Sequence, residues 1–183
     1  MTKMNFNHQL LVALPDMQDE RFKNAVILIC EHNEDGAMGL VINHPLNLET
    51  EQVFNELNLN EPLMNHTVLE GGPLNQNCGF VLHNNNQSYK SSIQLKNNLS
   101  LTTSKDLLEK IAKHDFKDQW QFILGCAGWH KDQLENEIAE NTWLTCPADL
   151  NLIFNTDIEK RWQSALALIG INDYKNITGI GHA

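Results

Sequence analysis

Two short apolar runs flank a polar turn between residues 25 and 45 of this chain. The first run, residues 25–30, is unbroken and rich in Val and Ile, and the second covers residues 38–42. The turn between them reads Asn33-Glu34-Asp35-Gly36, and short β-branched runs joined by an Asp-Gly turn predict a β-hairpin. Because an unbroken apolar run has both faces covered, we expect this hairpin to lie in the middle of a sheet.

The same periodicities predict the remaining elements. Strands are expected at residues 8–14, 67–70, 79–83, 91–95, 119–124 and 143–146. Helices are expected at residues 48–57, from residues 103–106 onward, at residues 129–140, and from the capping box Thr156-x-x-Glu159 to Gly170. Helices interleave with hairpins, so the predicted fold class is α+β (mixed α/β), a mixed, largely antiparallel sheet with helices packed on its faces. We expect one compact domain spanning residues 1–183.

Composition narrows the function classes. The chain has 183 residues, is 42% hydrophobic and carries a formal net charge of -10. No apolar run approaches the roughly 20 residues of a membrane helix, and no signal peptide is recognisable, so we expect a cytoplasmic protein without a membrane partner. The acidic balance argues against direct nucleic-acid binding. The four cysteines form no C-x-x-C pair, which indicates reduced thiols that are mostly buried.

Two groups of residues could carry chemistry. Cys30 and His32 are two residues apart on a predicted strand and should point to the same face. They could bind zinc with further ligands such as His44, His83, Cys126 or His130, or they could be a core cysteine beside a hydrogen-bonded histidine. Cys126 lies in Gly125-Cys126-Ala127-Gly128-Trp129, interpreted as a strand-to-helix turn, where His130 could act as its base or cysteine could simply be small enough to fit.

Turns at predicted strand ends are the remaining candidates. The sequence contains no G-x-G-x-x-G, G-x-S-x-G or H-E-x-x-H motif. Turns on a rigid sheet often form ligand sites, although turns rich in Gly and Pro more often only reverse the chain. The predicted ligand pocket comprises Cys30, His32, Asn43, Gly71, Gly72, Pro73, Ser104 and Asp106.

Short motifs occur in order along nearly the whole chain, at residues 30–33, 36–39, 41–43 with Pro45, 71–73, 79–83, 102–106, 143–144 with 147–149, 161–162 and 181–183. These motifs resemble those of the YqgE/AlgH family of bacterial proteins. Cys30 and His32 match the family motif, whereas His44, Cys78, Cys126 and Cys146 stand where the family usually has other residues. The resemblance implies a compact fold with a mixed sheet packed against helices and a Gram-negative bacterial cytosol. It also implies a link to transcriptional control of alginate production, from which the family is partly named, but no settled enzyme activity, cofactor or catalytic residue.

Three functions follow from these observations. The leading prediction is a non-enzymatic ligand-binding or regulatory module that recognises a small molecule or a protein, uses no cofactor, and affects transcription only indirectly. The first alternative is a hydrolase or transferase that uses Cys30, His32 or Asp106. The second, opposed by the net charge, is a regulator that binds DNA directly.

Overall fold

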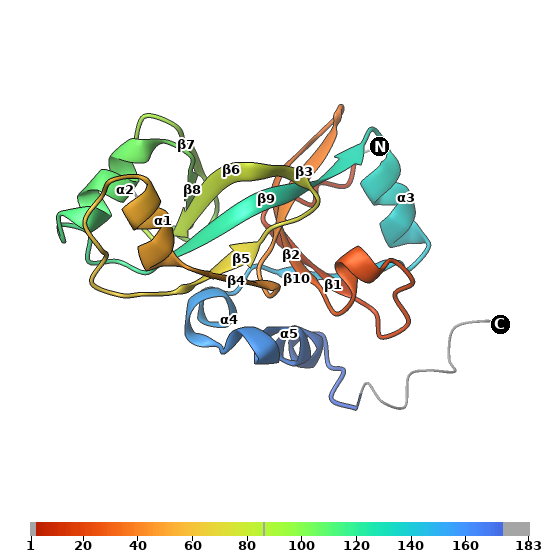
Figure 1. Cartoon of the computed structure of the whole chain (residues 1–183). Coiled ribbons are helices and arrows are strands. Elements are labelled where there is room, and N and C mark those ends of the chain that lie inside the picture. The colour runs from red at the N-terminus through yellow and green to blue at the C-terminus, as the bar shows by residue number, and fades with distance from the viewer. Residues whose placement is uncertain (1–2, 86, 174–183) are drawn as a thin grey trace.

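The computed structural model describes residues 3–85 and 87–173, and the ten strands within these residues form one curled sheet (Figure 1). The strands are β1 (Gln9–Ala13), β2 (Val26–Asn33), β3 (Gly36–Val41), β4 (Pro45–Glu49), β5 (Thr67–Glu70), β6 (Leu74–His83), β7 (Ser92–Gln94), β8 (Ser100–Thr102), β9 (Trp120–His130) and β10 (Trp143–Pro147).

The order of the strands confirms the predicted fold class. The main path runs β10-β1-β2-β3-β9-β6-β8-β7, with β5 also beside β9 and β4 beside β5. The pairing of β5 with β9 is parallel, and the other strand pairings in the described chain are antiparallel. The β2–β3 hairpin lies mid-sheet as predicted, because the alternating residues of β2 are buried in separate apolar clusters. Val26 and Leu28 belong to one cluster, and Ile27 and Ile29 belong to the other.

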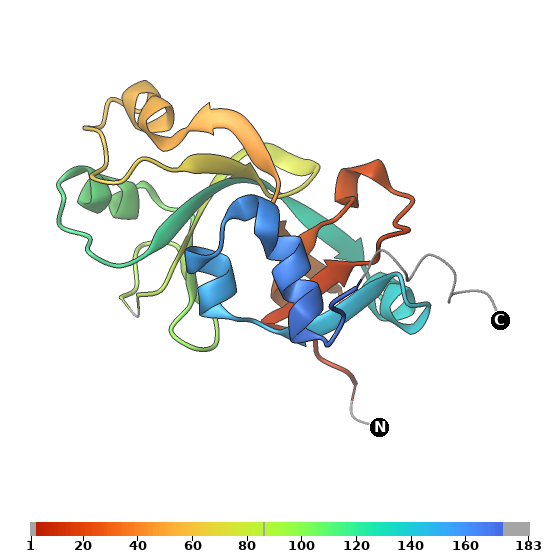
Figure 2. The same ribbon diagram turned by 90° about the horizontal axis from the view of Figure 1, so that it is seen from below.

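Short helices cover the sheet at three places. Helices α1 and α2 lie together at one end, where Phe54 and Leu107 pack against Val81 and Phe122 of the sheet. Helix α3 lies at the opposite end, and α4 and α5 lie close together on one side of the sheet (Figure 2). The α-helices are α1 (Thr50–Glu56), α2 (Lys105–Ala112), α3 (Gln133–Ala139), α4 (Leu150–Asn155) and α5 (Arg161–Leu168), and the 3-10 helices are η1 (Glu20–Phe22) and η2 (Ile158–Lys160).

Strand β9 is the longest strand described and connects the two ends of the molecule (Figure 1). Its first half pairs with β5 and β6, and its second half pairs with β3. The predictions that this strand ends at Gly125 and that a helix begins at Trp129 are wrong. Gly125 has a φ of +80° and lies within the strand, so the glycine allows β9 to bend instead of ending it.

Other boundaries also differ from expectation. Strands β4 and β8 were not predicted from the sequence, because each is short and is defined by pairing with another strand. The predicted long helix from Thr156 is split into η2 and α5, although Gly170, with a φ of +89°, follows its end as expected. Among residues 3–85 and 87–173, no helix has the length and apolar character needed to cross a membrane.

Candidate functional site

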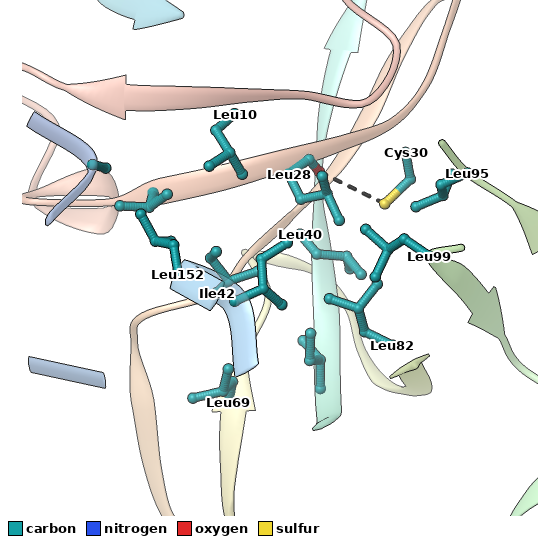
Figure 3. Packing of buried hydrophobic residues seen from close by; sticks show 14 of the residues in the cluster. Leu10, Leu28, Cys30, Leu40, Ile42, Leu69, Leu82, Leu95, Leu99 and Leu152 are labelled. Atoms are coloured by element: carbon teal, nitrogen blue, oxygen red, sulfur yellow. Dashed lines mark hydrogen bonds between the residues drawn. The ribbon is translucent and has the colours of Figure 1, made fainter. Parts of the chain in front are cut away.

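Cys30 and His32 do not face the same side of β2, so this expectation is wrong. The pairing with β3 skips from Ile29–Gly39 to Glu31–Met38, which makes Cys30 the extra residue of a β-bulge and shifts the alternation of side chains. Cys30 lies among buried leucines, where its Sγ donates to the Leu28 carbonyl at 3.6 Å (Figure 3). Burial raises the pKa of its thiol, so Cys30 is a core residue in this fold.

His32 lies on the opposite face and is held by two partners. Its Nδ1 accepts from the Phe6 amide at 3.1 Å, which leaves Nε2 to donate to Glu135 Oε1 at 2.8 Å. The imidazole is only 6% exposed and packs beside the Phe6 ring, with 5.5 Å between centroids. The ring therefore ties the N-terminal segment and α3 to β2.

The predicted turn residues line different parts of the surface. Asn43 accepts from the Val26 amide and donates to the Asn24 carbonyl, and it borders a shallow hollow beside Trp162. Pro73 borders a second hollow near Trp129, and Ser104 borders a third beside Phe122. The structure therefore distributes these turns over three hollows.

The glycine turn and the start of α2 have visible packing roles. A Cβ on Gly71 would lie 2.3 Å from the Gly125 carbonyl oxygen, so the missing side chain lets the turn approach the bend in β9. Ser104 donates to Asp106 instead of capping α2, and Asp106 accepts from the Lys90 amide at 2.9 Å. These contacts fasten the residues before β7 to α2.

The thiol of Cys126 is not at a helix N-terminus. It is buried within β9 and accepts from Asn75 Nδ2 at 3.8 Å. Burial raises the pKa of the Cys126 thiol, which opposes the role of nucleophile. The described residues also contain no group of three or more His, Cys, Asp or Glu side chains arranged to hold a metal ion.

A hollow of about 630 Å³, here called the Arg161 hollow, lies at the start of β9. One wall comes from the loop before β5 and from the first residues of β5 and β9, and the other comes from residues 154–161. Long-range folding therefore forms it from segments that are distant in sequence. Its lining includes His66, Thr67, Trp120, Gln121, Thr156 and Arg161.

Arg161 is the feature that distinguishes this hollow. The residue is only 4% exposed, and its guanidinium donates to two backbone carbonyls, from Nη1 to Ile42 at 2.6 Å and from Nε to Thr156 at 3.0 Å. No carboxylate in the described part of the chain lies within ion-pair distance of it. Burial lowers the pKa of Arg161 to about 10, with Asp157 opposing the shift, so the group remains a cation at neutral pH. The carboxylate of Asp157 acts on this cation only from beyond ion-pair distance, and a buried cation without an ion-paired carboxylate favours an incoming anion.

The other walls add an aromatic surface and hydrogen-bonding groups. The His66 ring meets Trp120 edge-on, with 4.8 Å between centroids. Burial lowers the pKa of His66, only partly offset by Glu49, so the imidazole is mostly neutral at pH 7. The Gln121 amide is fixed because its Nε2 donates to the Thr67 carbonyl at 2.9 Å. The hollow can therefore hold a flat or apolar group beside the Arg161 guanidinium.

Arg161 was not among the site residues predicted from the sequence, where it appears only within the family motif Arg161-Trp162. A usable signal was present, because Arg161 lies three residues after Ile158 and four before Ala165, on the face expected to be apolar. A charged residue at that spacing is placed towards the core. Its partners could not be read from the sequence, since Ile42 lies 119 positions away.

A curled, mainly antiparallel sheet with short helices packed around it places the chain in the α+β structural class. The AlgH-like family model matches residues 10–174, so the chain belongs to the AlgH-like family. A UPF0301 protein from Aliivibrio fischeri strain MJ11 is 43% identical, over 98% of this chain and 100% of the relative. A UPF0301 protein from Photobacterium profundum is 44% identical over the same shares. The family resemblance noted in the sequence is thus confirmed, although its closing stretch, residues 181–183, lies outside the described residues.

Solved structures carry the same fold. The solution structure of the AlgH protein from Pseudomonas aeruginosa superposes with a TM-score of 0.78 at 37% identity and covers 100% of both chains. A crystal structure of a protein from Corynebacterium diphtheriae gives a TM-score of 0.73 at 22% identity and covers 95% of this chain and 93% of that one. The second likeness shows the fold alone.

Proposed function

We propose that the protein is a non-enzymatic binding module whose Arg161 hollow takes a small ligand with one carboxylate or phosphate group. The observation that carries the proposal is the buried guanidinium, which borders a hollow of about 630 Å³ and has no carboxylate partner among the described residues. A planar guanidinium with unused N–H donors suits two-point contact with a carboxylate or phosphate. The wall of His66 and Trp120 would pack against the remainder of the ligand.

The mouth of the hollow favours a small anion over a polyanion. Lys117 is accompanied there by the exposed carboxylates of Asp118 and Glu159. Asp157 also borders the mouth and pairs with Lys160 at 3.1 Å. A nucleic-acid backbone would bring several phosphates against these acids, whereas a single anionic group can reach Arg161. An effect on transcription would therefore pass through a protein partner that responds to the bound ligand.

The described residues offer little support for a catalytic role. Cys30 and Cys126 are buried thiols with raised pKa values. His83 Nε2 lies 2.8 Å from Thr102 Oγ1, the distance of a base and a hydroxyl nucleophile, but both residues are fully buried. Burial lowers the pKa of His83 to about 4, and Nδ1 has no hydrogen-bond partner within the described chain. The orienting group of a triad is thus missing at this pair.

A ligand screen tests the proposal. Small monocarboxylates and phosphomonoesters should raise the melting temperature of the wild type and shift the Trp120 indole resonance in a ¹⁵N-labelled sample. Arg161→Lys keeps the charge but loses the planar fork, so affinity should fall about tenfold or more. Arg21→Lys is the matched control, because Arg21 is exposed and lies outside this hollow.

Two results would contradict the proposed function. One is that no anion in the screen stabilises the wild type. The other is that Arg161→Lys, with an unchanged circular dichroism spectrum, binds the same ligands as tightly as the Arg21→Lys control.

A further inference from the structure

A second hollow of about 560 Å³, here called the Glu137 hollow, lies at the other end of β9. Its lining includes Phe22 from η1, Trp129 from β9, Glu137 from α3 and Trp143 from β10. The Trp143 ring is edge-on to Phe22, with 5.7 Å between centroids, and to Trp129, with 6.5 Å. Three aromatic rings and one carboxylate therefore line the same hollow.

The carboxylate of Glu137 is fixed by three neutral donors. The indole Nε1 groups of Trp129 and Trp143 each donate to its Oε2 at 2.8 Å, and Gln133 Nε2 donates to its Oε1 at 3.0 Å. A carboxylate oxygen can accept two hydrogen bonds, so Oε2 is saturated while Oε1 has capacity for another donor. The Glu137 carboxylate is therefore held in place, and its Oε1 can accept one further hydrogen bond from an N–H group.

The charge of Glu137 has no cation beside it in the described part of the chain. The other acid of the hollow, Asp19, pairs with Arg21 at 2.7 Å. The guanidinium of Arg21 lies 5.5 Å from the centroid of the Phe22 ring, and it is exposed. The Phe22 ring thus already accepts a cation at its face, whereas the fixed carboxylate within the same hollow has none.

We propose that the Glu137 hollow binds the ammonium group of a small alkylamine, with Glu137 as counter-ion and the Phe22 ring as an aromatic wall. The ammonium donates a hydrogen bond to the remaining acceptor position of Oε1, and the alkyl chain packs against the rings. A quaternary ammonium ion has no N–H for this bond, so a primary amine is preferred. The proposal is independent of the Arg161 hollow.

The test uses the indole N–H resonances of the ¹⁵N-labelled full chain. Titration with n-butylammonium at pH 7 should shift the Trp129 and Trp143 signals, because both indoles share the carboxylate that the ligand contacts. Trp120 lies in the Arg161 hollow and Trp162 donates to the Ala13 carbonyl, so their signals should stay in place. The neutral isostere n-butanol and the quaternary tetramethylammonium ion should each bind at least about tenfold more weakly.

A pair of matched variants separates ligand binding from a purely structural role. Glu137→Gln keeps an acceptor oxygen for the indoles but removes the charge, and affinity for n-butylammonium should fall at least about tenfold. Glu140→Gln removes an exposed carboxylate from the same end of α3 and should bind like the wild type. Phe22→Leu should weaken binding by about threefold or more while leaving the carboxylate and its donors in place.

Several outcomes would overturn the proposal. It fails if n-butylammonium moves neither the Trp129 nor the Trp143 signal at millimolar concentration, or if n-butanol or tetramethylammonium binds as well. It also fails if a folded Glu137→Gln protein binds like Glu140→Gln. If Glu137→Gln does not fold, the affinities of the wild type for n-butylammonium, n-butanol and tetramethylammonium, together with the affinity of Phe22→Leu for n-butylammonium, test the proposal instead.

Discussion

The two hollows at the ends of β9 contain charges of opposite sign, and these charges differ in their burial and in their hydrogen-bond partners. Arg161 is 4% exposed and is contacted by two backbone carbonyls. Glu137 is half-buried and receives three side-chain donors, two of them from buried tryptophans. Partial exposure and three donors largely compensate the carboxylate, whereas full burial with two carbonyls leaves the guanidinium only partly compensated.

Both charges are proposed to bind a ligand, but they differ in what they contribute to the empty protein. The Glu137 carboxylate joins α3 to β9 and β10, so it should stabilise the empty protein. The desolvation cost of the Arg161 guanidinium is only partly compensated by its two carbonyl acceptors and the more distant Asp157, and a bound anion would reduce it further.

Gly72→Ala should disturb β9, the strand that contributes residues to both hollows. An added Cβ would lie 2.3 Å from the Cys126 carbonyl, and Gly72 has a φ of +150°, so a clash and backbone strain combine at the bend of β9. The free energy of unfolding, measured with urea, should fall by about 4 kcal/mol. Gly170→Ala is the control, because its φ is +89° but nothing lies within 4 Å of the added Cβ, and its cost should be about 1 kcal/mol. An equal effect of the two substitutions would show that the bend tolerates a side chain.

Glu137→Leu should destabilise the protein by about 3 kcal/mol. The substitution leaves the two indole N–H groups and the Gln133 amide without their acceptor, and buried unpaired donors are costly. Chemical denaturation of this variant beside Glu137→Gln measures the effect, and the glutamine variant should lose no more than about 1 kcal/mol. If Glu137→Leu is as stable as the wild type, the three hydrogen bonds do not hold α3 in place.

Arg161→Met should change stability by no more than about 1 kcal/mol. Two carbonyls lose a donor, but the desolvation cost of the unpaired cation disappears with it. The same denaturation experiment decides the point. A loss above about 3 kcal/mol would mean that the guanidinium is already compensated and that the contrast with Glu137 is mistaken.

Acidification should strengthen anion binding at the Arg161 hollow. Burial lowers the pKa of His66, so the imidazole stays neutral to a lower pH than an ordinary histidine does. It gains a proton only as the pH falls through this lowered pKa. A bound anion favours the charged ring, and affinity for a carboxylate should rise about threefold between pH 7.5 and 5.5. Isothermal titration calorimetry on wild type and His66→Gln tests this, and the variant should show a flat profile. An equal rise in both proteins would assign the proton to another group.

Local patterns of apolar and polar residues were sufficient to predict several elements of the fold. Residues 25–30 and 38–42 specified a mid-sheet hairpin, because an unbroken apolar run must be buried on both faces whatever its neighbours are. The fold class followed from the alternation of hairpins and helical spacings, and the motifs identified the family.

Which side chains contact one another depended on long-range packing. The bulge at Cys30 turned His32 to the opposite face, and the bend at Gly125 continued β9 where a helix was expected, since pairing with distant strands outweighed local preference. The Arg161 hollow depends on a contact across 119 positions, and the Glu137 hollow joins η1, β9, α3 and β10. Burial and hydrogen-bond partners are properties of the packed chain, so the sequence could place Arg161 on an apolar helix face but could not show which groups surround either charge.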